Sequence, residues 1–375
     1  MKSHIVIALI AFAYMAFLFN IGYFFPLPKE KEEKIDTRVL RKEALHRGLR
    51  PIPKRWEDAQ KLVETKNNPL TPQKVALGKR LYFDPILSKD QTINCASCHI
   101  LEAGGDDNRP TAIGYHNQPN PKHLNSPTVL NAALAVRQFW DARSPDVEDQ
   151  AKGPITAPFE MAMTPDEVVK RLREDKSYRK AFAQVFPKEG ITFDTVTKAI
   201  GAYERTLLTR GAYDRFLEGD DDAISDEAKR GLSLFMHLGC KGCHSGITVG
   251  GQSIQTFPLR PYDTPIVPHS VYRNGKRYFK EFSFASLFHK SPYPFADIGG
   301  FHGRNGQFRF RVPILRNVTR TAPYFHNGSV EKIEEAVRIM ARHQLGVDLS
   351  KKQIAQIVSF LKTLQGDPVG YLEKK

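Results

Sequence analysis

The stretches Cys95-Ala96-Ser97-Cys98-His99 and Cys240-Lys241-Gly242-Cys243-His244 share the pattern C-x-x-C-H. In one helical turn, two cysteines at this spacing lie on the same face, and the histidine that follows projects from the same turn. The two thiols can therefore add to the vinyl groups of one porphyrin while the imidazole reaches its iron. The sequence predicts two covalent c-type haems, attached through Cys95, Cys98, Cys240 and Cys243, with His99 and His244 as iron ligands.

Three other uses of the cysteines are less consistent with this pattern. The chain has four cysteines, and the two motifs contain all of them. A disulfide inside each motif would close a loop too short to constrain the chain, and a redox pair would not need a histidine after both copies. One zinc ion shared by the two motifs would leave both histidines surplus.

The composition is basic. The chain has 375 residues, enough for two or three domains, and 55 Lys plus Arg against 41 Asp plus Glu give a net charge of +14. No basic run with interleaved aromatic residues resembles a nucleic-acid module. We therefore expect no nucleic-acid partner, and we assign most of the excess charge to solvated surface.

The first residues predict a membrane segment. Residues 5–25 contain no charge, and a helix needs about 20 such residues to cross a bilayer. No small-x-small cleavage site follows, so an uncleaved anchor is favoured over a cleaved signal peptide. Because c-type haems are attached outside the cytoplasmic membrane, we expect a periplasmic protein held at the inner membrane by this helix.

Helix signals dominate the rest of the chain. Thr71 followed by Pro72 is typical of a helix start, and Thr164 with Glu167, like Ser350 with Gln353, forms a capping box. A helix precedes each C-x-x-C-H motif, which suggests a duplicated unit. The predicted fold is mainly α: two cytochrome c-like haem domains with long loops, preceded by an N-terminal transmembrane helix. The expected parts are an anchor or signal (1–27), a linker or stalk (28–69) and the two domains (70–215 and 216–375).

The segments around the motifs resemble the bacterial di-haem cytochrome c peroxidases over most of the chain, from about residue 70 to residue 366. They are residues 77–84, 125–131, 139–143, 150–154, 312–317 and 322–328. The resemblance implies a periplasmic enzyme that reduces hydrogen peroxide to water. Peroxide would bind at the N-terminal haem, and electrons would enter at the C-terminal haem from a small cytochrome c or cupredoxin. A homodimer is a further option.

The resemblance also implies roles for single residues. Met340 stands where the family places the sixth ligand of the second haem, although a methionine on an apolar stripe is more often ordinary core. Family members that oxidise protein tryptophans carry tyrosine at this position. Glu160 matches the carboxylate that moves the proton of peroxide, Gln150 matches its partner amide, and Trp140 matches an aromatic bridge between the haems. Apolar neighbours would raise the pKa of Glu160 by desolvation.

One loop departs from the family pattern. The family often carries a distal histidine within Ile-Gly-His, whereas this chain has Ile113-Gly114-Tyr115-His116, and its loop is about two residues longer before Asn125. His116 is the favoured reversible iron ligand, with His123 and an open iron as alternatives. If His116 binds, the enzyme should rest inactive until the second haem is reduced.

The resemblance further implies one calcium ion between the haems. Its ligands would be the side chain of Asn125 and the carbonyl oxygens of Thr321 and Pro323, which are the hard donors that Ca²⁺ prefers. Residues 251–310 look longer than usual, and their basic residues form either a docking surface or a solvated loop. Two other functions stay open: a membrane-anchored di-haem electron-transfer cytochrome, and a di-haem oxidase of an organic or protein substrate.

Overall fold

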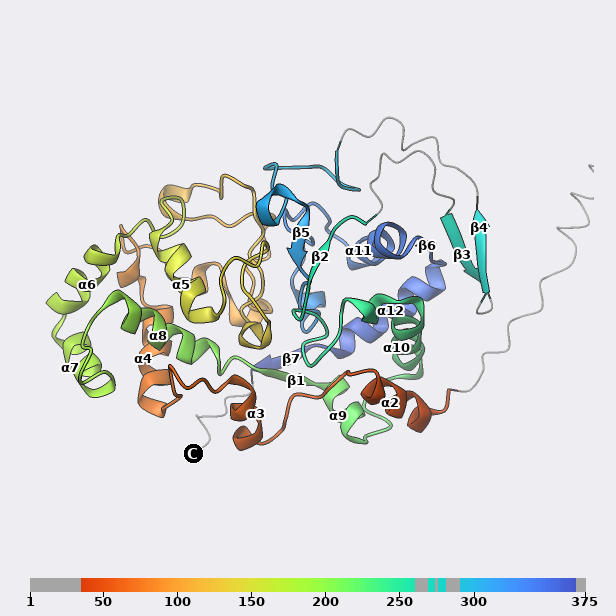
Figure 1. Cartoon of the computed structure of the whole chain (residues 1–375), viewed down its shortest axis with the longest axis horizontal. Helices are drawn as coiled ribbons and strands as arrows, with labels where there is room; N and C mark the ends of the chain where they lie inside the picture. The colour runs from red at the N-terminus through yellow and green to blue at the C-terminus, as the bar shows by residue number, and fades with distance from the viewer. Residues whose placement is uncertain (1–34, 260–268, 274–275, 281–290, 369–375) are drawn as a thin grey trace, which may run out of the picture. The chain divides into compact units, whose positions relative to one another are not determined.

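The computed structural model describes residues 35–259, 269–273, 276–280 and 291–368, which form a mainly helical structure (Figure 1). The predicted membrane segment and the side chains of residues 260–290, including most of the basic loop, lie outside the described residues. Among the residues that are described, no helix is both long and apolar enough to span a bilayer. From Thr37 onward they belong to one compact unit, and the predicted boundary between two haem domains stays a prediction.

The helices that follow the first 70 residues gather at the left of Figure 1: α4 (Pro72–Phe83), α5 (Val147–Thr156), α6 (Pro165–Glu174), α7 (Lys176–Val185) and α8 (Phe193–Glu204). The predicted start of α4 is confirmed, since the Thr71 side chain accepts a hydrogen bond from the Lys74 amide. Helices α4 and α8 can cross closely because Gly78 has no side chain. A Cβ at this position would overlap the Ala199 carbonyl.

A second group of helices lies at the right of Figure 1: α10 (Asp226–Leu238), α11 (Ile333–Met340) and α12 (Lys351–Thr363). The capping box predicted at Ser350 is present. Here too a glycine permits close packing, because a Cβ at Gly231 would overlap the Gln356 carbonyl on α12. One π-helical turn, Ala341–Leu345, extends α11.

The strands are short and pair segments that are far apart in the sequence. β1 (Thr209–Gly211) pairs with β7 (Gly366–Pro368), and β2 (Ile254–Thr256) pairs with β5 (Arg309–Arg311), both antiparallel. The third sheet has the order β4 (Lys276–Lys280), β3 (His269–Arg273), β6 (Val347–Asp348). These small sheets connect distant segments of the chain, and the described strands form no extensive sheet.

The segment expected to be a stalk lies along the body from residue 37 onward. It contains α2 (Thr37–His46) and α3 (Trp56–Val63). The Arg41 guanidinium donates to the carbonyl of Phe216 on α9 (Ala212–Glu218) at 2.7 Å, and the Arg205 guanidinium donates to the Val63 carbonyl at 3.0 Å. Both ends of the segment are therefore attached to helices of the main body.

A buried ion pair joins this segment to the rest of the chain. Arg316 donates two hydrogen bonds to Asp214, at 2.8 and 2.9 Å, and both side chains are at most 1% exposed. Asp214 also accepts from the backbone amides of Ile52 and Gly211, and Arg316 donates to the Ile247 carbonyl. Every polar group of the pair thus has partners, and the partners outside the pair come from three separate parts of the chain.

We expect Asp214→Asn to lower the free energy of unfolding by about 3–5 kcal/mol, because it leaves the Arg316 charge buried without its counter-ion. Denaturant titration of the haem-loaded protein measures this. The control is Glu218→Gln on the same helix, which breaks an exposed pair with Arg210 and should cost less than about 1 kcal/mol. Equal losses in the two variants would contradict the importance assigned to Asp214.

Candidate functional site

The two C-x-x-C-H motifs have the same local structure. Each forms a short 3-10 turn, Cys95–Ser97 and Cys240–Gly242, and in each the histidine amide donates to the carbonyl of the first cysteine at 3.0 Å. All four cysteines are free thiols. Burial raises the pKa of Cys98 and of Cys240 to about 12, so these are not activated thiolates. The four thiols are available for covalent attachment.

At the first motif, backbone groups fix the orientation of the histidine ring. Nδ1 of His99 lies 3.2 Å from the Gly105 carbonyl oxygen, and the Tyr82 hydroxyl donates to the His99 carbonyl at 2.8 Å. Burial lowers the pKa of His99, which keeps the imidazole neutral. With Nδ1 directed at a carbonyl, Nε2 is the nitrogen left to bind iron, as in other histidine-ligated metal sites. These residues fit a c-type haem.

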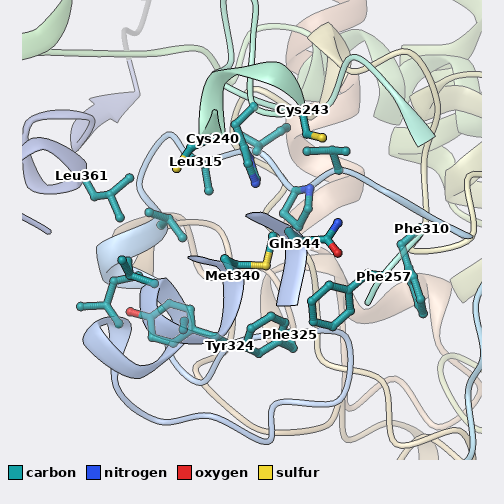
Figure 2. Close-up of a pocket in the computed structure, with 18 of the residues that line it drawn as sticks. Cys240, Cys243, Phe257, Phe310, Leu315, Tyr324, Phe325, Met340, Gln344 and Leu361 are labelled. Atoms are coloured by element: carbon teal, nitrogen blue, oxygen red, sulfur yellow. The ribbon is translucent and has the colours of Figure 1, made fainter. Parts of the chain in front are cut away.

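The second motif opens onto an apolar cavity of about 210 Å³. Figure 2 shows the Met340 thioether reaching into the middle of this cavity, with Cys240 and Cys243 on one side and Tyr324 and Phe325 on the other. His244 lines the same cavity, and burial lowers its pKa to about 4. A neutral imidazole and a thioether facing one apolar cavity fit the ligand set of an electron-transfer haem.

A glycine lets the chain pass close behind His244. Gly250 has φ +137°, and a Cβ there would overlap the Pro313 carbonyl and approach the His244 ring. The Gly250 amide donates to the Ser245 carbonyl at 2.9 Å, so the loop after the motif folds back on itself. This close backbone packing limits how far the histidine ring can turn.

Glu160 lies beside the first motif. The loop that contacts Cys98 also contacts Glu160: Sγ of Cys98 lies 3.9 Å from the Ile113 carbonyl oxygen, and the Tyr115 amide donates to the Glu160 carbonyl at 2.7 Å. Burial raises the pKa of Glu160 itself, and the nearby Arg143 and a hydrogen bond from Asn120 oppose this shift. The Asn120 amide donates to Oε1 of Glu160 at 3.3 Å. The carboxyl group is thus both desolvated and held in place, as expected of a group that exchanges protons.

The amide that contacts Glu160 differs from the one predicted. Gln150 lies half-buried on α5, and within the described part of the chain no hydrogen bond joins it to Glu160. Asn120 was not among the predicted site residues. The sequence offered one indication of such a contact, the loop expected to be longer before Asn125. A longer loop next to a predicted site can supply additional contacts.

The two candidate distal histidines lie in different surroundings. His116 is exposed, and its ring lies 4.0 Å from that of Tyr115. His123 is partly buried, and its Nδ1 atom is buried with no hydrogen-bond partner among the described residues. In this structure His116 faces solvent, and iron ligation by either histidine stays a prediction.

Trp140 and the predicted calcium ligands line the same cavity. The Trp140 indole donates to the Asn125 carbonyl at 2.9 Å, and the Asn125 amide donates to the Pro323 carbonyl at 3.2 Å. Thr321 lines the same cavity. Thr128 lines this cavity too, and its hydroxyl donates to the Gly104 carbonyl at 2.6 Å, next to the Gly105 carbonyl that faces His99. The wall of the cavity that holds His244 is therefore connected to the loop that orients His99.

The chain is similar in sequence to known proteins. The family model described as di-haem cytochrome c peroxidase matches residues 72–222. The chain is 38% identical over 341 residues to the cytochrome c551 peroxidase of Pseudomonas aeruginosa, across 88% of this chain and 89% of that one. It is 36% identical over 354 residues to the cytochrome c peroxidase Ccp of Escherichia coli, across 93% of this chain and 68% of that one.

Among solved structures, the chain is similar to a MauG-like protein associated with microbial copper homeostasis. The two share 27% sequence identity with a TM-score of 0.63, and the match covers 80% of this chain and 92% of the other.

Proposed function

The chain belongs to the di-haem cytochrome c peroxidase family, and we propose that it reduces hydrogen peroxide to water in the periplasm with electrons from a small cytochrome c or cupredoxin. Its two relatives named above are peroxidases and match most of its length. When bound, the two haems supply the redox chemistry that carries two electrons to peroxide. The finer organisation that we propose is two cytochrome c-like domains behind an inner-membrane anchor at residues 5–25.

Glu160 carries the proposal for the peroxide site. Breaking the O–O bond requires a group that takes a proton from one oxygen and returns it to the departing oxygen. Glu160 is buried against the loop that contacts Cys98 of the first motif, and one of its carboxylate oxygens accepts a hydrogen bond from Asn120. A permanently six-coordinate electron relay needs no such group, which favours the peroxidase over the electron-transfer alternative. Gln150 and Trp140 keep their proposed supporting roles.

We expect Glu160→Gln to bind both haems and to lose at least about 100-fold in peroxide turnover, because the amide cannot accept the proton. Steady-state assay with reduced cytochrome c measures this, and Glu102→Gln, an exposed glutamate near the same motif, is the control. In the wild type, kcat/KM should rise with pH through a midpoint above the usual glutamate pKa of about 4.3, because burial raises that pKa and the ionised form is the base. Normal turnover in Glu160→Gln would remove this residue from the mechanism.

Met340 is the proposed sixth ligand of the second haem. It ends α11, lines the cavity together with His244, and directs its sulfur into it (Figure 2). A thioether opposite an imidazole raises the reduction potential, which suits the haem that receives electrons from the donor protein. This role also fits the presence of methionine, and not tyrosine, at residue 340.

Met340→Leu keeps the size of the side chain and removes the sulfur. We expect the variant to lose the long-wavelength absorption band of methionine-ligated ferric haem and to show a lower reduction potential for one haem only. Redox titration followed by visible absorption measures both. Met236→Leu, a buried methionine on α10 that does not line the cavity, is the control. An unchanged spectrum in Met340→Leu would exclude this residue as the ligand.

One calcium ion is proposed at Asn125, Thr321 and Pro323. The side chain of Asn125 lies within hydrogen-bond distance of the Pro323 carbonyl, and all three residues line one cavity. Rotation of the Asn125 amide would turn its oxygen toward the same place as the carbonyl oxygens. Amide and carbonyl oxygens are suitable Ca²⁺ ligands, and an ion here would join two segments far apart in the chain.

Removal of calcium by a chelator should lower both peroxidase activity and the melting temperature, and added Ca²⁺ should restore them. Calcium at 100 times its dissociation constant would stabilise the folded chain by about 2.7 kcal/mol. Asn125→Ala should lack this response. The measurement is thermal unfolding against calcium concentration, with Mg²⁺ as the control ion. A wild-type protein that does not respond to either treatment would exclude the site.

For the resting state, His116 remains the proposed reversible ligand of the first haem, with His123 or an open iron as alternatives. The exposed position of His116 corresponds to the released form in this scheme. Ligation would close the peroxide site until the second haem is reduced, and such order–disorder switching of a loop is a known type of activation. A homodimer is part of the same proposal.

A further inference from the structure

The loop formed by residues 112–124 lies directly on the backbone of Glu160. The Tyr115 amide donates to the Glu160 carbonyl at 2.7 Å, and a Cβ at Gly114 would overlap the Phe159 carbonyl. The loop also closes on itself, because the Ala112 amide donates to the Leu124 carbonyl at 3.0 Å. Its position relative to Glu160 is therefore set by backbone contacts before any side chain is considered.

Within this loop, one orientation of the Asn120 side-chain amide gives hydrogen-bond partners to both its oxygen and its nitrogen. Its Oδ1 accepts a hydrogen bond from the Lys122 amide at 2.9 Å, so its NH₂ group is the end that faces Oε1 of Glu160, at 3.3 Å. The Asn120 backbone amide donates to the Ala112 carbonyl at 2.9 Å, and the residue is only 8% exposed. The donor that faces Glu160 is thus buried and fixed at two further points.

We propose that Asn120 is a positioning residue of the peroxide site: its side-chain N–H holds Oε1 of Glu160 and stabilises the ionised carboxylate, so that Oε2 is left to accept the proton of peroxide. This inference rests on the proposed acid–base role of Glu160. Asn120 itself need not touch the peroxide, and it acts through the carboxylate that it orients.

The surroundings of Glu160 explain why such a donor matters. Burial favours the neutral carboxylic acid, which cannot accept a proton. Two groups oppose burial: the positive charge of Arg143, whose side chain is half exposed and therefore screened by water, and the hydrogen bond from Asn120. Within the described part of the chain, Cys98 is a further titratable group whose pKa the Glu160 charge affects, and it carries no charge once its sulfur is bonded to haem. The fixed and buried contribution comes from Asn120.

The experiment compares Asn120→Leu and Asn120→Asp in the haem-loaded enzyme. Leucine removes the donor. Aspartate keeps the oxygen that accepts from Lys122, and with it the turn, but replaces the donor by a second carboxylate. Gln118→Ala is the matched control, because Gln118 is exposed on the same loop.

Two measurements follow Glu160 in these variants. Infrared difference spectra against pH report the protonation of its carboxyl group, whose band is identified by its absence in Glu160→Gln. The pH profile of kcat/KM for peroxide reports catalysis. We expect both midpoints to rise by about one pKa unit in Asn120→Leu and by more in Asn120→Asp. Below the midpoint the rate should fall about tenfold and then recover at higher pH, with KM for the electron donor unchanged.

The outcomes separate this inference from the function that it builds on. Unshifted midpoints in both folded, haem-loaded variants would overturn it, and so would a uniform loss of rate at every pH, which indicates a structural role only. If Glu160→Gln is inactive while the Asn120 variants behave like the wild type, this inference alone is overturned. Normal turnover in Glu160→Gln would overturn the proposed role of Glu160 and this inference with it.

Discussion

The buried pair of Asp214 and Arg316 is the constraint on which the two haem sites depend. Asp214 fixes the turn at Gly211 where the chain leaves the first group of helices, and Arg316 fixes the Ile247 carbonyl just after the second motif. Two charges taken out of water stabilise a fold only when their hydrogen bonds are satisfied, and here backbone groups from three parts of the chain satisfy them. One interaction therefore sets how the first helices, the second motif and the N-terminal segment meet.

Burial away from water shifts the pKa values of the histidines and of Glu160 in opposite directions. Burial lowers the pKa of His99 and His244, which keeps both imidazoles neutral and able to bind iron. The same loss of water raises the pKa of Glu160, where ionisation is needed. A carboxylate in such a site therefore requires a donor, whereas a ligand histidine requires only an acceptor for its second nitrogen. The Gly105 carbonyl supplies that acceptor for His99.

Features could be predicted from the sequence when the residues involved lie close together along the chain. The helix starts at Thr71, Thr164 and Ser350 were predicted correctly, because capping involves residues three apart. Membership of the peroxidase family was also predicted correctly from local segments. The contact between Asn120 and Glu160 spans 40 residues, and that between Asp214 and Arg316 spans 102. No local pattern encodes such contacts, since they depend on how loops pass one another.

The same reasoning explains why the position of Met340 could be predicted more readily than the surroundings of Glu160. Met340 lies on a helix, where the spacing of apolar residues determines which side chains face the core, and its sulfur does enter the cavity (Figure 2). Glu160 and His116 lie on loops, where no regular spacing determines the contacts of a side chain. In this chain the loop brings the Asn120 amide to Glu160 and leaves His116 exposed. The loop that the family pattern presents as a supplier of a ligand is, in this conformation, a support for the carboxylate.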